Sequence, residues 1–195
     1  MVKDWNRFCC ERTGHDVDYY SNAFNGSFKR WQPILCYVGY SLILKECGGC
    51  GRGLGPWYVI ACIPTFIETK AYNAIEEYQL KPDGTINTIF TFHSGGFDGP
   101  LKKYNPRGFI VDKVNNSTWG MQFIWPFKAE FLITYLTPDY SQTVIGRNKR
   151  DYVWIQARTP EIPEEDYQRL LSILKEQGYD ITKIRKVPQR WKVKE

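Results

Sequence analysis

The feature that most constrains the fold is a series of eight short β-prone segments with no helix between them. They are separated by turn residues, and 82–84 (Pro-Asp-Gly) is the clearest turn, because proline presets φ and glycine accepts a positive φ. Short strands joined by tight turns are typical of antiparallel up-and-down barrels. An aromatic content of 16% agrees with this class, since flat rings pack well on pleated strands. The segments are 57–62, 72–80, 85–92, 104–111, 118–123, 128–136, 142–146 and 152–157.

One amphipathic helix is expected after the last of these segments. Pro163 suits a first helical turn, and the acidic residues 164–166 suit the positive end of the helix dipole. Gly178 is expected to end the helix in a left-handed conformation, and a short final strand is expected within 181–187. The apolar side chains of one helical face are Tyr167, Leu170, Leu171 and Leu174. The sequence therefore predicts an all-β fold, an eight-stranded antiparallel up-and-down barrel with one C-terminal helix packed on its outside.

The net charge of +5 is concentrated near the C-terminus. Residues 181–195 hold six of the 26 basic residues and one of the 21 acidic residues, so 1–180 carries equal numbers of both. A nucleic-acid-binding protein normally has a basic face on the fold itself, so we expect no nucleic-acid partner. We expect 188–195 to be a solvated basic tail, with weak attraction to anionic lipid headgroups as the alternative.

The first fifty residues differ from the rest of the chain. They hold five of the six cysteines and show no sustained strand or helix period, which predicts a poorly ordered extension over 1–50 and a barrel domain over 51–187. Cys47 and Cys50 have the spacing of a metal or redox pair, but a second ligand pair is missing and the surrounding glycines disfavour a helix. We therefore expect no metal and no cofactor. The apolar stretch 31–44 follows two basic residues, as in a secretory leader, but no cleavage site or lipobox is recognisable after it.

The order of motifs resembles the lipocalin family. The segment 55–57 (Gly-Pro-Trp) is similar to the G-x-W motif of the first lipocalin strand, and Arg158 resembles the arginine that follows the last barrel strand. The segment 137–140 occupies the place of the middle motif, although Thr137 stands where the family usually has an acidic residue. The region 176–183 is similar to one branch, which contains bacterial outer-membrane lipoprotein lipocalins, plant temperature-induced lipocalins and apolipoprotein D.

The resemblance implies structural roles for Gly55, Trp57 and Arg158. An eight-stranded barrel is wide enough to hold one small ligand when one end is plugged. Trp57 is expected to fill the closed end, while the guanidinium of Arg158 stacks on its indole ring and donates to nearby backbone carbonyls. These three residues are thus expected to close the barrel rather than to contact a ligand.

A ligand would occupy the inside of this barrel. An apolar pocket binds by the area that it buries, and the resemblance implies a fatty acid or a lysophospholipid, with a role in transport, storage or maintenance of membrane lipids. The side chains expected to line the lumen, taking one parity for each strand, are Phe90, Met121, Phe131, Ile133, Tyr135 and Trp154. The same side chains would otherwise fill a solid core, and the protein would then be an interaction module without a ligand.

An enzyme is the less favoured alternative. Cys62 lies near the end of the first strand, but a thiol nucleophile needs a base or a lowered pKa. Neither His15 nor His93 is tied to it by a motif. We therefore predict a binding protein without enzymatic activity.

The segments 95–100 and 125–127 are expected at the rim of the open end. Bulky apolar side chains at such a rim would allow contact with a membrane surface or a second copy of the protein, as in a homodimer. The resemblance also implies an outer-membrane or periplasmic location.

Overall fold

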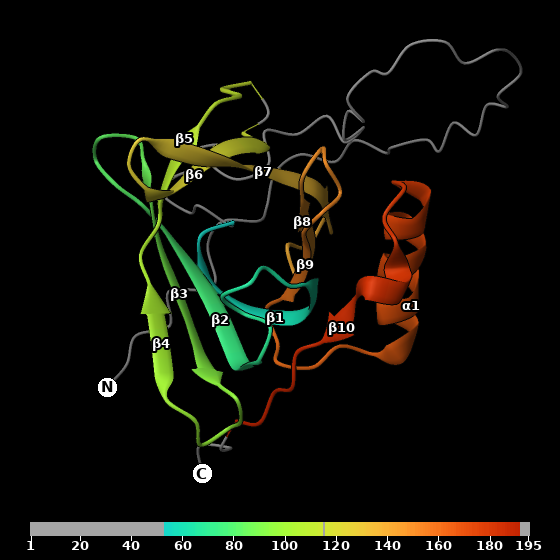
Figure 1. Cartoon of the computed structure of the whole chain (residues 1–195). Helices are drawn as coiled ribbons and strands as arrows, with labels where there is room; N and C mark the ends of the chain where they lie inside the picture. Colours follow the sequence, from blue (N-terminus) through green and yellow to red (C-terminus); the bar gives the residue numbers. More distant parts are fainter. Residues whose placement is uncertain (1–52, 115, 192–195) are drawn as a thin grey trace, which may run out of the picture. The chain divides into compact units, whose positions relative to one another are not determined.

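The computed structural model describes residues 53–114 and 116–191, which form strands, one α-helix and one short 3-10 helix (Figure 1). The helices are α1 (Glu164–Glu176) and η1 (Ile181–Lys183). The strands are β1 (Gly55–Ile63), β2 (Ala71–Leu80), β3 (Ile86–Ser94), β4 (Leu101–Tyr104), β5 (Arg107–Ile110), β6 (Thr118–Ile124), β7 (Phe127–Leu136), β8 (Gln142–Gly146), β9 (Val153–Ala157) and β10 (Arg185–Lys186). The predicted extension 1–50 lies outside the described residues.

The strands form one antiparallel sheet that closes on itself. Neighbouring strands follow the chain order from β1 to β9, and β1 also pairs with β9. β4 and β5 share one position in the barrel, because both pair with β3. The predicted eight-stranded up-and-down barrel is confirmed.

Two of the expected strands differ in detail. The segment 104–111 was expected to be one strand, but the chain bends at Asn105 and Pro106, between β4 and β5. Proline has no N–H for the sheet, and the Pro106 carbonyl accepts a hydrogen bond of 3.1 Å from the Thr88 amide. The expected final strand, 181–187, is reduced to η1 and to the two residues of β10, which pair with β1.

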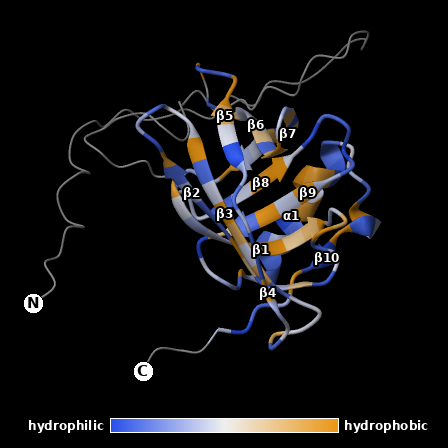
Figure 2. Ribbon diagram, turned by 60° about the vertical axis from the view of Figure 1, so that its left-hand side comes forward, coloured by the Kyte–Doolittle hydropathy of each residue, from blue (hydrophilic) through white to orange (hydrophobic). Residues whose placement is uncertain are grey.

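Side chains alternate between the inside and the outside of the barrel. In β3, Ile86, Thr88, Phe90 and Phe92 are buried and the residues between them are partly exposed. Figure 2 shows hydrophobic and hydrophilic positions interspersed along the strands. The period of two in the sequence therefore corresponds to an inner face and an outer face.

The helix α1 covers the outside of β1, β8 and β9. Its buried residues Tyr167, Leu170 and Leu174 belong to the same apolar cluster as Val144 and Ile155. Gly178 has φ +83°, as expected for a left-handed cap, and the Tyr179 amide beyond it donates to Leu174 O at 3.0 Å. Among the described residues, no helix has the length and apolarity that crossing a membrane requires.

The described part of the basic C-terminal segment follows the barrel wall. The Asn73 amide donates to Pro188 O at 2.9 Å, and Gln189 Nε2 donates to Val59 O at 2.8 Å. The Trp191 ring packs edge-on against Tyr58, with centroids 5.4 Å apart. Residues 188–191 are thus bonded to β1 and β2, where a solvated tail was expected.

Antiparallel order places the loops in two groups. The loops 64–70, 95–100, 125–126 and 147–152 lie at the end of the barrel where β1 finishes. The first residues of β1, with Trp57, lie at the opposite end. We call these the open end and the closed end.

Candidate ligand-binding site

Trp57 and Arg158 meet at the closed end. The indole of Trp57 is 2% exposed and donates from Nε1 to Gly53 O at 3.0 Å. The Arg158 guanidinium carbon lies 3.7 Å from the centroid of the indole ring, which is close stacking for a cation on an aromatic face. This is the geometry expected of residues that close the barrel.

Arg158, which follows β9, is also bonded to two other chain segments, the start of β1 and the loop between β7 and β8. Its Nη1 donates to Pro56 O at 2.8 Å, its Nη2 to Leu54 O at 2.9 Å, and its Nε to Tyr140 O at 3.4 Å. Burial lowers the pKa of Arg158 to about 10, so the side chain remains a cation at neutral pH. Gly55 has φ +90°, a conformation that L-residues rarely adopt, and a Cβ there would lie 3.7 Å from Arg158 Nη1. Glycine is thus favoured at position 55 by the backbone conformation, while a Cβ there would make only an ordinary contact with the guanidinium.

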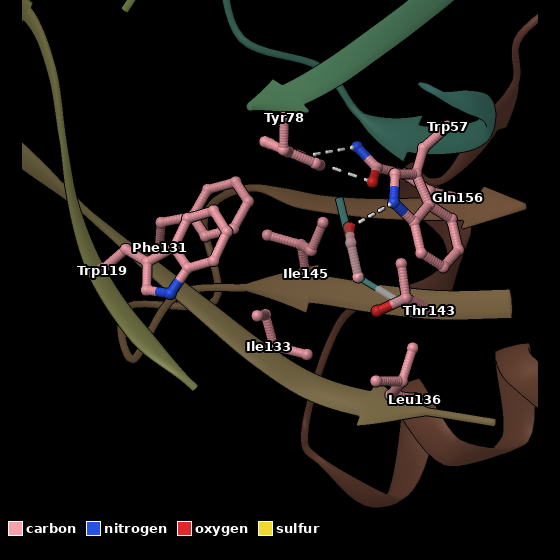
Figure 3. Close-up of a pocket in the computed structure, with 10 residues that line it drawn as sticks. Trp57, Tyr78, Trp119, Phe131, Ile133, Leu136, Thr143, Ile145 and Gln156 are labelled. Carbon is pink, nitrogen blue, oxygen red and sulfur yellow. Dashed lines mark hydrogen bonds between the residues drawn. The ribbon is translucent and has the colours of Figure 1, made fainter. Parts of the chain in front are cut away.

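Aromatic side chains fill much of the barrel above Trp57. Trp119 and Phe131 stack with centroids 5.2 Å apart and planes 9° from parallel, and Tyr78 meets Trp119 edge-on at 5.6 Å. A cavity of about 20 Å³ remains beside them, which is room for about one water molecule (Figure 3). Its lining residues are Gly53, Trp57, Tyr78, Trp119, Phe131, Ile133, Leu136, Thr143, Ile145 and Gln156.

Five of the six side chains expected in the lumen lie on the inner face. This placement follows from the residues with which they pair across the strands and from the inner apolar clusters to which they belong. The five are Phe90, Met121, Phe131, Ile133 and Trp154. That they contact a ligand stays a prediction.

Tyr135 lies on the outer face, so its expected place in the lumen is corrected. The register of β7 against β8 shifts between Ile133 and Tyr135, and Tyr135 pairs with the outward-facing Val144. Its hydroxyl accepts a hydrogen bond of 2.6 Å from Arg169 Nη1 of the helix. A bulge reverses parity, and an alternating pattern alone does not reveal where it falls.

A buried polar cluster lies inside the barrel among these apolar side chains. Gln156 Nε2 donates to Glu76 Oε2 at 2.7 Å and lies 3.3 Å from the Tyr78 hydroxyl (Figure 3 shows Tyr78 and Gln156). Burial raises the pKa of Glu76 from 4.5 to about 7, against the opposing effect of hydrogen bonds from Tyr78 and Gln156. Apolar character alone does not point to this cluster, although strand alternation places Glu76 on the same side as Ala74 and Tyr78.

A second buried carboxylate belongs to the loop that joins β1 to β2. Glu68 is 2% exposed, and Trp154 Nε1 donates to both of its carboxylate oxygens at 3.1 Å. The backbone amide and the hydroxyl of Thr65 each donate to Glu68 Oε1 at 2.9 Å. Burial raises the pKa of Glu68. These bonds hold the loop 64–70 against an inner-face tryptophan at the open end.

Cys62 is a free, fully buried thiol on the same inner cluster as Phe90 and Phe92. Burial, with a smaller contribution from the charge of Glu68, raises its pKa to about 12. The thiolate is therefore scarce at neutral pH, and Cys62 behaves as a small apolar side chain.

Large apolar side chains are exposed at the open end. The turn between β6 and β7, together with the strand residues beside it, presents Phe123, Ile124, Trp125 and Phe127, which are 51–82% exposed. Phe66 in the loop 64–70 is 86% exposed, and Leu101 at the start of β4 is 62% exposed. The expected rim segments 95–100 and 125–127 both lie at this end.

Comparison with known proteins identifies the family. A closed eight-stranded barrel with an apolar inside, one outer helix and a tryptophan–arginine plug defines a class of small binding proteins. The family model described as "Lipocalin-like domain" matches residues 50–189, so the chain belongs to the lipocalin family.

The relatives fall within the lipocalin branch that the region 176–183, after the helix, indicates. Temperature-induced lipocalin-1 of Arabidopsis thaliana is 34% identical over 71% of this chain and 77% of its own length. Outer membrane lipoprotein Blc of Escherichia coli K12 is 27% identical over 68% of this chain and 74% of its own. Apolipoprotein D of Macaca fascicularis is 27% identical over 67% and 71%.

Solved structures agree on the fold. Lobster apocrustacyanin A1 superposes with a TM-score of 0.58 at 16% identity, covering 73% of this chain and 81% of that chain. At this identity the likeness shows the barrel fold and leaves the ligand open.

Proposed function

We propose that the protein binds a hydrophobic small molecule inside the barrel and carries it. The observation that supports this most directly is the inner face of the open half. There, the small side chains of Val59, Ala71 and Ala74 share a buried cluster with the rings of Phe90 and Phe92. Small residues beside flat rings suit an alkyl chain, whose binding grows with the apolar area that it buries.

The ligand class that we propose is a fatty acid or a lysophospholipid, and the role is transport, storage or maintenance of membrane lipids. The bacterial relatives are named outer membrane lipoproteins, which supports an outer-membrane or periplasmic location. Lipocalins are in general binding proteins, and Cys62 is too buried and too weakly acidic to favour the enzymatic alternative.

Titration of the full-length protein with lysophosphatidylcholine or palmitate is expected to change tryptophan fluorescence saturably, at micromolar or lower concentration. Trp154 lies on the inner face and is expected to report the bound chain, so Trp154→Phe should lose most of the change. Trp191→Phe, which alters a ring on the outside of the barrel, is the matched control and should keep it. Absence of any saturable change from folded protein contradicts the proposal.

A second candidate function has its own supporting observation. The cavity of about 20 Å³ and the Trp119–Phe131 stack leave little free space in the closed half. A barrel filled throughout in this way would serve as a protein-interaction module without a ligand. The titration separates the two, because a filled barrel gives no saturable fluorescence change.

We propose that the apolar rim contacts a membrane surface, where a carried lipid would enter or leave. Replacing Trp125 and Phe127 together by serine removes two side chains that are 82% and 76% exposed. Co-sedimentation with phosphatidylcholine–phosphatidylglycerol vesicles is expected to fall at least tenfold, which corresponds to about 1.4 kcal/mol.

Leu80→Ser is the control for this experiment, since Leu80 is 47% exposed and lies at the closed end. It should sediment with vesicles as the wild type does. Equal vesicle binding by the double variant argues against the proposed membrane contact. If the wild type instead elutes as a dimer and the double variant as a monomer, the rim is a homodimer interface.

A further inference from the structure

Polar side chains gather on the inner face between two apolar regions. Glu76 and Tyr78 of β2, Thr88 of β3 and Gln156 of β9 are all buried. Glu76 is the cross-strand partner of Phe90, and Tyr78 is the partner of Thr88. Directly paired residues of antiparallel strands share a face, so Thr88 lies beside Tyr78 inside the barrel.

The hydrogen bonds within this cluster leave capacity unused. Gln156 Nε2 donates to one carboxylate oxygen of Glu76, Tyr78 also acts on that carboxylate, and the Tyr78 hydroxyl lies 3.4 Å from Gln156 Oε1. The Thr88 hydroxyl is fully buried, yet no described donor or acceptor pairs with its Oγ1. A buried hydroxyl without a partner is costly, and in a binding protein it indicates a place where a ligand atom completes the bonding. Tyr78, the cross-strand partner of Thr88, and Gln156, the hydrogen-bond partner of Glu76, both line the cavity.

The charged side chain that acts on Glu76 itself is another carboxylate. Glu76 is a carboxylate, and Glu68 on the loop 64–70 acts on it as a second negative charge. Arg158 acts on Tyr78 from the closed end, and Arg185 acts on Glu68, where its Nη2 donates to Glu68 O at 2.6 Å. No cation is hydrogen-bonded to Glu76 among the described residues. A ligand carboxylate beside Glu76 would therefore be repelled, whereas a hydroxyl or an ammonium group would donate to it.

The distribution of polar and apolar side chains along the barrel indicates how a ligand with an alkyl tail would be oriented. Toward the open end the rings of Phe90, Phe92 and Tyr104 pack together on the inner face, and the rim beyond them exposes apolar side chains. The Glu68 carboxylate at this end is already bonded to Trp154 and Thr65. An alkyl tail thus fits the mouth, and a polar head fits the middle of the barrel.

We propose that Glu76, Tyr78, Thr88 and Gln156 form a donor-selective subsite. It takes the hydroxyl or ammonium head of a long-chain alcohol or amine, and the alkyl tail points toward the open end. This inference rests on the proposed ligand binding in the barrel and adds a chemical class to it. A fatty acid would keep its carboxylate away from this depth and bind more weakly.

The test compares three ligands of one chain length on the full-length protein at pH 8: decylamine, 1-decanol and decanoate. We expect the amine and the alcohol to bind about tenfold more tightly than the acid, measured by calorimetry and by tryptophan fluorescence. Glu76→Gln removes the charge and keeps the shape, so the amine should weaken, the acid should tighten, and the gap should close. Thr88→Val should weaken the alcohol severalfold and leave the acid unchanged.

Glu77→Gln is the matched control, because Glu77 is the next residue of β2, faces outward and accepts a hydrogen bond from Gln79. It should keep the wild-type order of affinities. The inference is overturned if decanoate binds as tightly as decanol to the wild type, or if Glu76→Gln and Glu77→Gln behave alike. If lysophosphatidylcholine binds while neither the amine nor the alcohol does, the subsite fails and the proposed function stands. If no ligand binds, both fail.

Discussion

Replacing Arg158 by alanine is expected to lower the free energy of unfolding by about 1–3 kcal/mol and to leave ligand affinity unchanged. The guanidinium donates to the carbonyls of Leu54 and Pro56 and covers the indole ring of Trp57. Without it, the two carbonyls lose their donor and the tryptophan face is opened to water. The side chain does not line the cavity, so a loss of binding is not expected.

Urea unfolding of the variant and the wild type, followed by circular dichroism, measures this difference. Arg107→Ala is a suitable control, because Arg107 also lies over an aromatic ring, that of Phe109, but is exposed and pairs with Asp83 on the surface. Its removal should change stability by less than about 0.5 kcal/mol. If Arg158→Ala kept the stability of the wild type and lost ligand binding, the closing role would be wrong.

The barrel could be predicted from the sequence because its main determinants are local. The turn at 82–84 is held by its own residues: Gly84 adopts φ +75°, and the Asp83 carboxylate accepts from the Thr85 amide at 3.0 Å. Helix α1 begins after a proline, carries three acidic residues in its first turn and ends before Gly178. Such features depend on a few neighbouring residues, so they are visible in a single sequence.

The closing residues could be placed because the motif resemblance fixed both ends of the barrel. The parity of β7 could not be predicted, because its shift depends on how β7 meets β8 and the helix. Tyr135 is directed outward by that register, and Arg169 supplies its hydroxyl with a partner. Bulges of this kind arise from contacts between strands, which a pattern along one strand does not contain.

The inner polar cluster depends on contacts between distant parts of the chain. Strand alternation places Glu76 inside, but apolar character alone does not select a carboxylate as a lumen residue. Its partner Gln156 lies 80 positions further along the chain. Only closure of β9 onto β1 brings the two together. The requirement for glycine at position 108 likewise depends on neighbouring strands. A Cβ there would lie 3.0 Å from Ile86 Cβ of β3 and 3.1 Å from Met121 Sδ of β6.

Glu76 is expected to make the protein less stable as the pH rises from about 4.5 to about 7. Its pKa is 4.5 in an exposed setting and about 7 in the folded barrel, so the folded state holds the proton more tightly than the unfolded state does. The corresponding stabilisation is complete below pH 4.5 and is lost as the pH rises through 7. A shift of this size corresponds to about 3 kcal/mol.

The Glu76→Gln variant isolates this contribution, because its neutral amide resembles the protonated acid at every pH. Thermal melting of both proteins between pH 4 and pH 8 should show similar midpoints at pH 4 and a higher midpoint for the variant at pH 8, by roughly 5–10 °C. Glu68 also has a raised pKa, but it is present in both proteins and largely cancels in the difference. The outward-facing Glu77→Gln should follow the wild type throughout. If Glu76→Gln loses stability as steeply as the wild type when the pH rises, then Glu76 titrates as an exposed carboxylate.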